Sequence, residues 1–151
     1  DLRPDAWLCR HQRRLPDMSG PVLLVVAAAI FDKAGNILLA QRPEGKSLAG
    51  LWEFPGGKLE AGEAPEAALC RELKEELKLT VEPSALKPIS FASFGYRDFH
   101  LLMPLYEVRD WQGTPTGLEG QSLAWVKPAE LGNYDAPPAD IPLFEELARR
   151  Y

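Results

Sequence analysis

The sequence has little cysteine, no long hydrophobic run and no excess of basic charge. Its two cysteines, Cys9 and Cys70, lie far apart, and neither has a CxxC or histidine spacing around it, so neither a disulfide framework nor a zinc site is indicated. The longest apolar run, at 21–31, is much shorter than the roughly 20 residues of a membrane-spanning helix. These absences predict a cytoplasmic protein that does not enter a membrane.

The charge balance narrows the choice of partner. A formal net charge of -5 argues against a general nucleic-acid binder, which needs a basic surface to displace counterions from phosphates. Binding of one small anion through a metal ion remains compatible with this net charge. With 26% charged and 46% hydrophobic residues, the composition is that of a folded chain.

The length of 151 residues fits one domain with a real core. We expect residues 21–151 to form this domain and residues 1–20 to be a poorly ordered arm, because the arm has four arginines and lacks the apolar centre of a secretory signal. Two oligomeric states remain open, a monomer and a homodimer.

Strand-like and helix-like segments alternate along the chain. Residues 22–31 and 36–42 read as two strands joined by "DKAG", which favours a β-hairpin. Apolar patterning predicts further strands over 51–54, 89–96, 100–108 and 122–126, and helices over 65–79 and 142–151. Interleaved strands and helices predict an α/β fold with helices sandwiching a sheet.

The stretch "CRELKEEL", at 70–77, concentrates carboxylates on the longer predicted helix. Helical geometry gives Glu75 basic neighbours at Arg71 and Lys78, as a solvated, salt-bridged face would have. Glu72 and Glu76 have no basic residue three or four positions away, and they lie next to the leucine stripe of the helix. Their repulsion costs about 0.2–0.5 kcal/mol, and a bound cation would relieve it.

Carboxylates without nitrogen or sulfur ligands select a hard cation, Mg²⁺ or Mn²⁺. An acidic solvent face is the alternative interpretation, with about equal weight from spacing alone. The segment "PGGK" before the helix puts Gly56 and Gly57 at a strand end, where backbone amides can approach a phosphate, and adds Lys58. By itself this segment is more typical of an ordinary turn than of a phosphate-binding site.

Taken together, these residues resemble the Nudix box, GX5EX7REUXEEXGU with U aliphatic. The matching positions are Gly57, Glu63, Arg71, Glu72, Leu73, Glu75, Glu76 and Leu79. Lys78 departs from the pattern because the family usually has glycine there. We expect this change to alter the end of the helix locally and to leave the chemistry intact.

The resemblance extends over roughly residues 22–150. "LWEFPGGKLEAGE" and "RDWQGTPTGLEGQSLAWV" are similar to the MutT branch of the family, the 8-oxo-dGTP diphosphatases, and "PPADIPL" is similar also to CTP pyrophosphohydrolases. The resemblance implies the Nudix fold, an α/β/α sandwich on a mixed β-sheet. It further implies hydrolysis of a nucleoside triphosphate to monophosphate and pyrophosphate, which protects DNA from oxidised precursors. The alternatives are CTP or 5-methyl-dCTP hydrolysis, and a non-catalytic Nudix domain that senses nucleotides.

The same resemblance implies a Mg²⁺ site, with Mn²⁺ as a possible substitute. Glu72, Glu75 and Glu76 would be ligands, and the Gly56 carbonyl and Glu119 would complete the set. Glu72 and Glu119 are both candidates for the base that deprotonates the attacking water, and the choice between them stays open. Without the family, Glu119 would be an ordinary polar residue of a glycine-flanked loop.

Arg42 and Lys58 are the candidate phosphate ligands, although a surface salt bridge is an equal alternative for Arg42. Arg71 and Glu63 are expected to form a charge-assisted pair that fixes the loop of Gly57 against the helix.

Base selection is assigned to two residues by resemblance. Phe54 would lie near the base, and Asp140 stands where MutT enzymes use an asparagine to read 8-oxoguanine. Asparagine donates and accepts hydrogen bonds, whereas an ionised aspartate only accepts, so cytosine nucleotides remain possible. Asp140 is equally interpreted as the N-cap of the last helix, and the two roles are compatible.

Overall fold

The computed structural model of the chain describes residues 20–151, so the expected N-terminal arm lies, apart from Gly20, outside the described residues. Two α-helices, two short 3-10 helices and seven strands follow one another along the described part. In chain order they are β1 (Val22–Ile30), β2 (Ile37–Gln41), β3 (Trp52–Glu53), β4 (Gly56–Lys58), α2 (Pro65–Leu77), η1 (Pro83–Ala85), β5 (Leu86–Gly95), β6 (His100–Val108), β7 (Ser122–Val126), η2 (Pro128–Asn133) and α3 (Ile141–Arg150).

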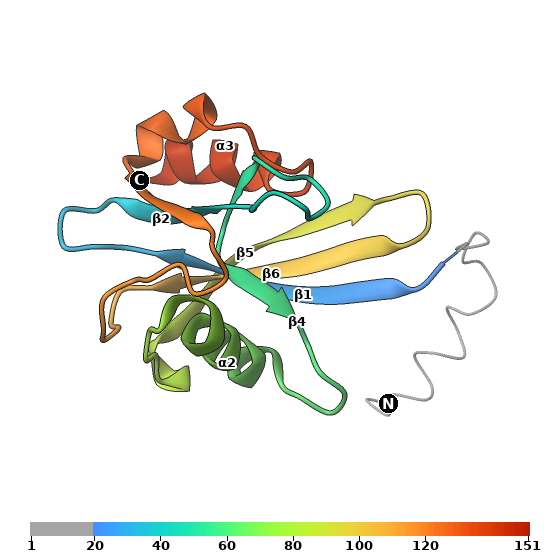
Figure 1. Ribbon diagram of the computed structural model, residues 1–151, viewed down its shortest axis with the longest axis horizontal. Helices are drawn as coiled ribbons and strands as arrows, with labels where there is room; N and C mark the ends of the chain where they lie inside the picture. Colours follow the sequence, from blue (N-terminus) through green and yellow to red (C-terminus); the bar gives the residue numbers. More distant parts are fainter. Residues whose placement is uncertain (1–19) are drawn as a thin grey trace, which may run out of the picture.

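The strands form two sheets. The larger has the order β4-β1-β6-β5, with β1 and β6 parallel and the other pairs antiparallel. The smaller has the order β3-β2-β7 and is antiparallel throughout. Helix α2 covers one side of these strands and α3 the other (Figure 1). The predicted α/β/α sandwich on a mixed sheet is confirmed.

Strand β1 lies between β4 and β6, and its sequence explains this interior position. Its residues alternate between two cores, with Val26, Ala28 and Ile30 packing toward α2, and Ala27 and Ala29 toward α3. All five are essentially inaccessible to solvent. A strand that is buried on both faces needs apolar residues at every position, which explains the uninterrupted apolar run in the sequence.

The predicted hairpin between the first two strands is wrong beyond its turn. A single bridge joins Phe31 to Ile37, and the Asp32 carboxylate accepts hydrogen bonds from the turn. The two strands then diverge into different sheets, since β1 pairs with β4 and β6, whereas β2 pairs with β3 and β7. Turn residues determine the local reversal, but the partners along the strands are determined by tertiary packing.

The glycines of "PGGK" form a strand instead of a loop. Gly56 pairs with Ala27 and Gly57 with Val26 in the antiparallel ladder between β4 and β1. A Cβ at Gly56 would clash with the Val26 carbonyl oxygen, so the close approach of β4 to β1 requires glycine.

Helix α2 ends in the geometry that glycine normally provides. Lys78, the C-cap, has φ 61 and ψ 29. Its N–H donates to the Lys74 carbonyl, and the Leu79 N–H donates to the Leu73 carbonyl. The expected alteration of this helix end is therefore wrong, because lysine adopts the left-handed conformation itself. None of the helices described over residues 20–151 combines the length and the apolar character needed to cross a membrane.

Candidate active site

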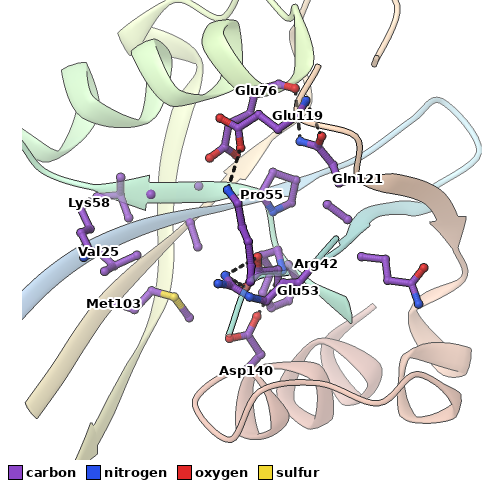
Figure 2. A pocket seen from close by; sticks show the side chains of 18 of the residues that line it. Val25, Arg42, Glu53, Pro55, Lys58, Glu76, Met103, Glu119, Gln121 and Asp140 are labelled. Atoms are coloured by element: carbon purple, nitrogen blue, oxygen red, sulfur yellow. Dashed lines mark hydrogen bonds and ion pairs between the residues drawn. The ribbon is translucent and has the colours of Figure 1, made fainter. Parts of the chain in front are cut away.

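A pocket of about 270 Å³ opens between the two sheets beside the last turn of α2 and the start of α3. Figure 2 shows side chains from β1, the segment 53–58, the loops after β2 and before β7, the last turn of α2, and Asp140 just before α3 around this pocket. The pocket brings together eight of the predicted site residues: Arg42, Phe54, Gly56, Gly57, Lys58, Glu76, Glu119 and Asp140. The others, Glu63, Arg71, Glu72 and Glu75, do not line the pocket.

Two carboxylates of α2 face the glycine strand. A Cβ at Gly57 would meet the Glu72 carboxylate oxygens at 2.6 and 2.7 Å, so Gly57 provides the space that Glu72 occupies. Glu76 lies within hydrogen-bonding reach of Glu72. Burial, and then the contact with Glu72, raise the pKa of Glu76 to about 9.

Arg71 ties the loop before α2 to the helix, as predicted. Its Nε and Nη2 donate to the two oxygens of Glu63 at 2.8 and 2.9 Å, and Nη2 also donates to the Lys58 carbonyl at 3.2 Å. This forked pairing lowers the pKa of Glu63 to about 2 and holds the chain after β4 in place. Gly57 is thereby fixed against α2.

Arg71 also contacts two carboxylates of its own helix. Its Nη1 donates to Glu72 at 3.0 Å and to Glu75 at 3.1 Å. The expectation that Glu72 has no basic neighbour within the helix is therefore wrong. The arginine side chain is long enough to reach Glu72 at the adjacent position, which spacing by three or four residues does not include.

Glu119 lies on the loop across the pocket from α2. Its carboxylate is 3.8 Å from Lys46 Nζ, and its backbone N–H donates to the Gln121 side chain at 2.8 Å. Gln121 in turn donates to the Glu76 carbonyl, which attaches this loop to the end of α2. Over residues 20–151, no three acidic, histidine or cysteine side chains converge on one point. Glu75 is turned toward Arg71, and Glu119 toward Lys46.

Arg42 lines the pocket and also forms an ion pair. Its Nη1 lies 3.2 Å from Glu53, and its Nε donates to the Ser47 carbonyl at 2.7 Å. Both interpretations of Arg42 from the sequence are thus compatible with its position. The pocket exposes its guanidinium beside a salt bridge that fixes its orientation.

Asp140 is buried at the floor of the pocket. Its side chain accepts a hydrogen bond from the Phe54 N–H at 3.2 Å, and it makes no capping bond to α3. The capping role predicted for this carboxylate is therefore wrong, although its backbone carbonyl begins the helix. Burial, followed by the charge of Glu53, raises the pKa of Asp140 to about 7.

Glu53 and Lys46, which were not predicted as site residues, also line the pocket. Glu53 pairs with Arg42, and burial raises its pKa against that pairing. A charge between Trp52 and Phe54 in a short apolar strand was a usable signal, because a partly buried charge needs a partner. Lys46 lies in a polar loop and carries no comparable signal.

The comparisons with known proteins agree with this geometry. The family model described as a NUDIX domain matches residues 26–146. The CTP pyrophosphohydrolase of Escherichia coli (strain K12) is 42% identical over 123 residues, which cover 82% of this chain and 90% of that protein. The 8-oxo-dGTP diphosphatase of Haemophilus influenzae is 38% identical over 130 residues, covering 86% of this chain and 94% of that one.

Among solved structures, one from a study of MutT from Aliivibrio salmonicida and Vibrio cholerae is 37% identical, with a TM-score of 0.74. It covers 86% of this chain and 99% of that structure. The family match includes β1 from Val26 onward, the glycine strand, α2 and the loop of Glu119, all of which contribute to the pocket. The chain belongs to the Nudix family and is a Nudix hydrolase.

Proposed function

We propose that this hydrolase is a Mg²⁺-dependent nucleoside triphosphate pyrophosphohydrolase that acts on 8-oxo-dGTP in the cytoplasm. It would release the nucleoside monophosphate and pyrophosphate, and so keep an oxidised precursor out of DNA. The proposal rests on one observation: a single pocket contains carboxylates, basic side chains and a buried aspartate. Carboxylates lie at one end, the cations Arg42 and Lys58 line it, and Asp140 lies at its floor.

The residues present fit a hard divalent cation. Glu72 lies against Gly57 and Glu76 contacts Glu72, so a cation between the two carboxylates would find the oxygen ligands that Mg²⁺ prefers. Glu75, Glu119 and the Gly56 carbonyl complete the proposed set. Mn²⁺, with similar ligand preferences, is a plausible substitute.

When bound, the metal ion would neutralise phosphate charge and lower the pKa of a water molecule. Side chains of the protein bind the phosphates, accept the proton and position the substrate. Lys58 and Arg42 bind the phosphates, and Glu72 or Glu119 accepts a proton from the attacking water. Arg71 and Glu63 hold the glycine strand against α2, so that substrate and carboxylates keep one relative position.

Asp140 and Phe54 would select the base. With its pKa near 7, the Asp140 carboxyl is present in both protonated and ionised forms near neutral pH. The protonated form offers a donor and an acceptor, as the asparagine of MutT enzymes does, which supports 8-oxoguanine.

A second substrate class has specific support. An ionised aspartate accepts from the amino group of cytosine, and the 42% identical relative is named a CTP pyrophosphohydrolase. CTP and 5-methyl-dCTP are therefore the alternative substrates.

The deciding experiment measures kcat/KM with Mg²⁺ for 8-oxo-dGTP, dGTP, CTP and 5-methyl-dCTP, with products separated by chromatography. We expect 8-oxo-dGTP to exceed dGTP by at least about 100-fold, because one or two base-specific hydrogen bonds left unmade cost about 1–3 kcal/mol each. A higher kcat/KM for CTP or 5-methyl-dCTP would show that a cytosine nucleotide, and not 8-oxo-dGTP, is the substrate. Absence of hydrolysis of all four would contradict the proposal and support nucleotide sensing.

A further inference from the structure

One face of the larger sheet extends beyond the cover of α2. Strands β1, β6 and β5 continue past this helix toward the end of the sheet where β1 begins (Figure 1). Apart from Ser93 and His100, which share a hydrogen bond, the side chains on this part of the α2 face are apolar, and these apolar residues belong to neither core. We call them the open face: Val22, Leu24, Phe91, Leu102 and Pro104.

The register of the sheet makes these residues neighbours. Leu24 pairs with Leu102, and Pro104 pairs with Phe91, so the side chains lie side by side over three strands. Exposure is 43% for Leu24, 49% for Val22 and 65% for Phe91. A contiguous exposed apolar patch on a sheet normally has a partner.

The opposite face of the same sheet end is covered. There Phe94, Tyr96 and Phe99 pack on one another, with ring centroids 4.9 Å apart in each pair, and contact the core on the α3 side. Apolar side chains at this end of the sheet are therefore covered on one face and exposed on the other. Among the described residues, the α2 side simply has no element there.

We propose that residues 1–19 of the same chain cover the open face. The chain enters the sheet at the end where β1 begins, because the Pro21 carbonyl accepts a hydrogen bond from the His100 N–H. Val22 is both the first residue of β1 and part of the open face. A segment tethered at that point is at high effective concentration toward the face. Nineteen residues reach up to about 60 Å, whereas three strands span only about 10 Å.

The composition of the segment complements the surface. It includes Leu2, Trp7, Leu8, Leu15 and Met18, which can bury apolar area, and four arginines. The open face is bordered by carboxylates. Glu66 accepts a bond from the Tyr106 hydroxyl at 3.2 Å, and Tyr106 lies two residues along β6 from Pro104. Glu60 follows Leu59, whose N–H donates to the Leu24 carbonyl.

The proposal is tested on the full chain by paramagnetic broadening. Replacing Cys70 with serine leaves Cys9 as the only cysteine, and a nitroxide attached there reports where the segment lies. We expect loss of the amide signals around Leu24, Leu102 and Phe91, with signals of β2 and β7 unchanged. Even, weak broadening over the whole chain would overturn the proposal.

Variants separate docking from chance proximity. Phe91→Lys should restore the lost signals, because it places a charge in the open face, and Leu8→Lys in the segment should do the same. Leu48→Lys is the matched control, since Leu48 is similarly exposed at 46% but lies in the loop between β2 and β3. It should leave the broadening unchanged.

A mixture of isotope-labelled protein without nitroxide and unlabelled protein with nitroxide tests the other occupant. Broadening in this mixture would mean that the face binds a second copy of the chain, and it too would overturn the assignment. Persistence of the broadening in both Phe91→Lys and Leu8→Lys would show that the apolar contact is not the cause.

Discussion

The Glu72 carboxylate fills the space beside Gly57, so Gly57 controls the placement of Glu72, a predicted metal ligand. We expect Gly57→Ala to displace Glu72 and to lower kcat/KM by about 100-fold, the cost of misplacing a catalytic group by around 1 Å. The matched control is Gly132→Ala, because a Cβ at Gly132 meets no atom within 4 Å. Equal activity of the two variants would show that Glu72 can move without loss.

Asp140 should give stability a pH dependence opposite to that of a salt-bridged aspartate. Its pKa is raised from 3.8 to about 7, so the folded state binds a proton that the unfolded state releases. This contribution is complete below about pH 4, falls as the pH rises to about 7, and is absent above. Asp140→Asn removes the titration, so its Tm relative to the wild type should rise between pH 5 and pH 8. Melting curves at both pH values measure the difference, and a constant difference would refute the burial effect.

The end of α2 shows strain confined to one element. Lys78 adopts φ 61, which costs a residue with a Cβ more than it costs glycine. We therefore expect Lys78→Gly to stabilise the protein by about 0.5–1 kcal/mol in urea denaturation. Lys74→Gly, one turn earlier in the helix interior, is the control and should destabilise by about 1 kcal/mol. Destabilisation by both would indicate that Lys78 makes contacts of its own.

At the scale of the element, β1 and α2 were the best predicted parts. Their patterns, an uninterrupted apolar run and a leucine stripe, depend only on which faces are buried. The hairpin failed because a turn signal says nothing about the partners of the strands it joins. Strand β4 was missed because two glycines have no strand propensity, and they pair only because β1 is near enough to require residues without side chains.

For the whole molecule, a bound ion that recognises only the folded chain should raise its stability. At 100 times its dissociation constant, Mg²⁺ would add about 2.7 kcal/mol, which corresponds to a Tm higher by about 5 °C or more. Glu72→Gln and Glu76→Gln should each reduce this shift and lower turnover by at least about 100-fold, while circular dichroism stays unchanged. Glu145→Gln, exposed on α3, should behave as the wild type. Full activity of both α2 variants would contradict the metal assignment.

The sequence by itself determined the α/β class, the acidic helix and the spacing of the Nudix box. These are local properties, since periodicity and fixed offsets along one helix decide which side chains share a face. Tertiary structure alone decided that Asp140 bonds to the Phe54 N–H instead of capping α3, and that Glu53 joins Arg42 in the pocket. The Asp140 contact joins residues 86 positions apart. Such contacts, and the burial that raises the pKa of Asp140 and Glu76, exist only when strands, helix and loops pack together, and no pattern along the chain encodes them.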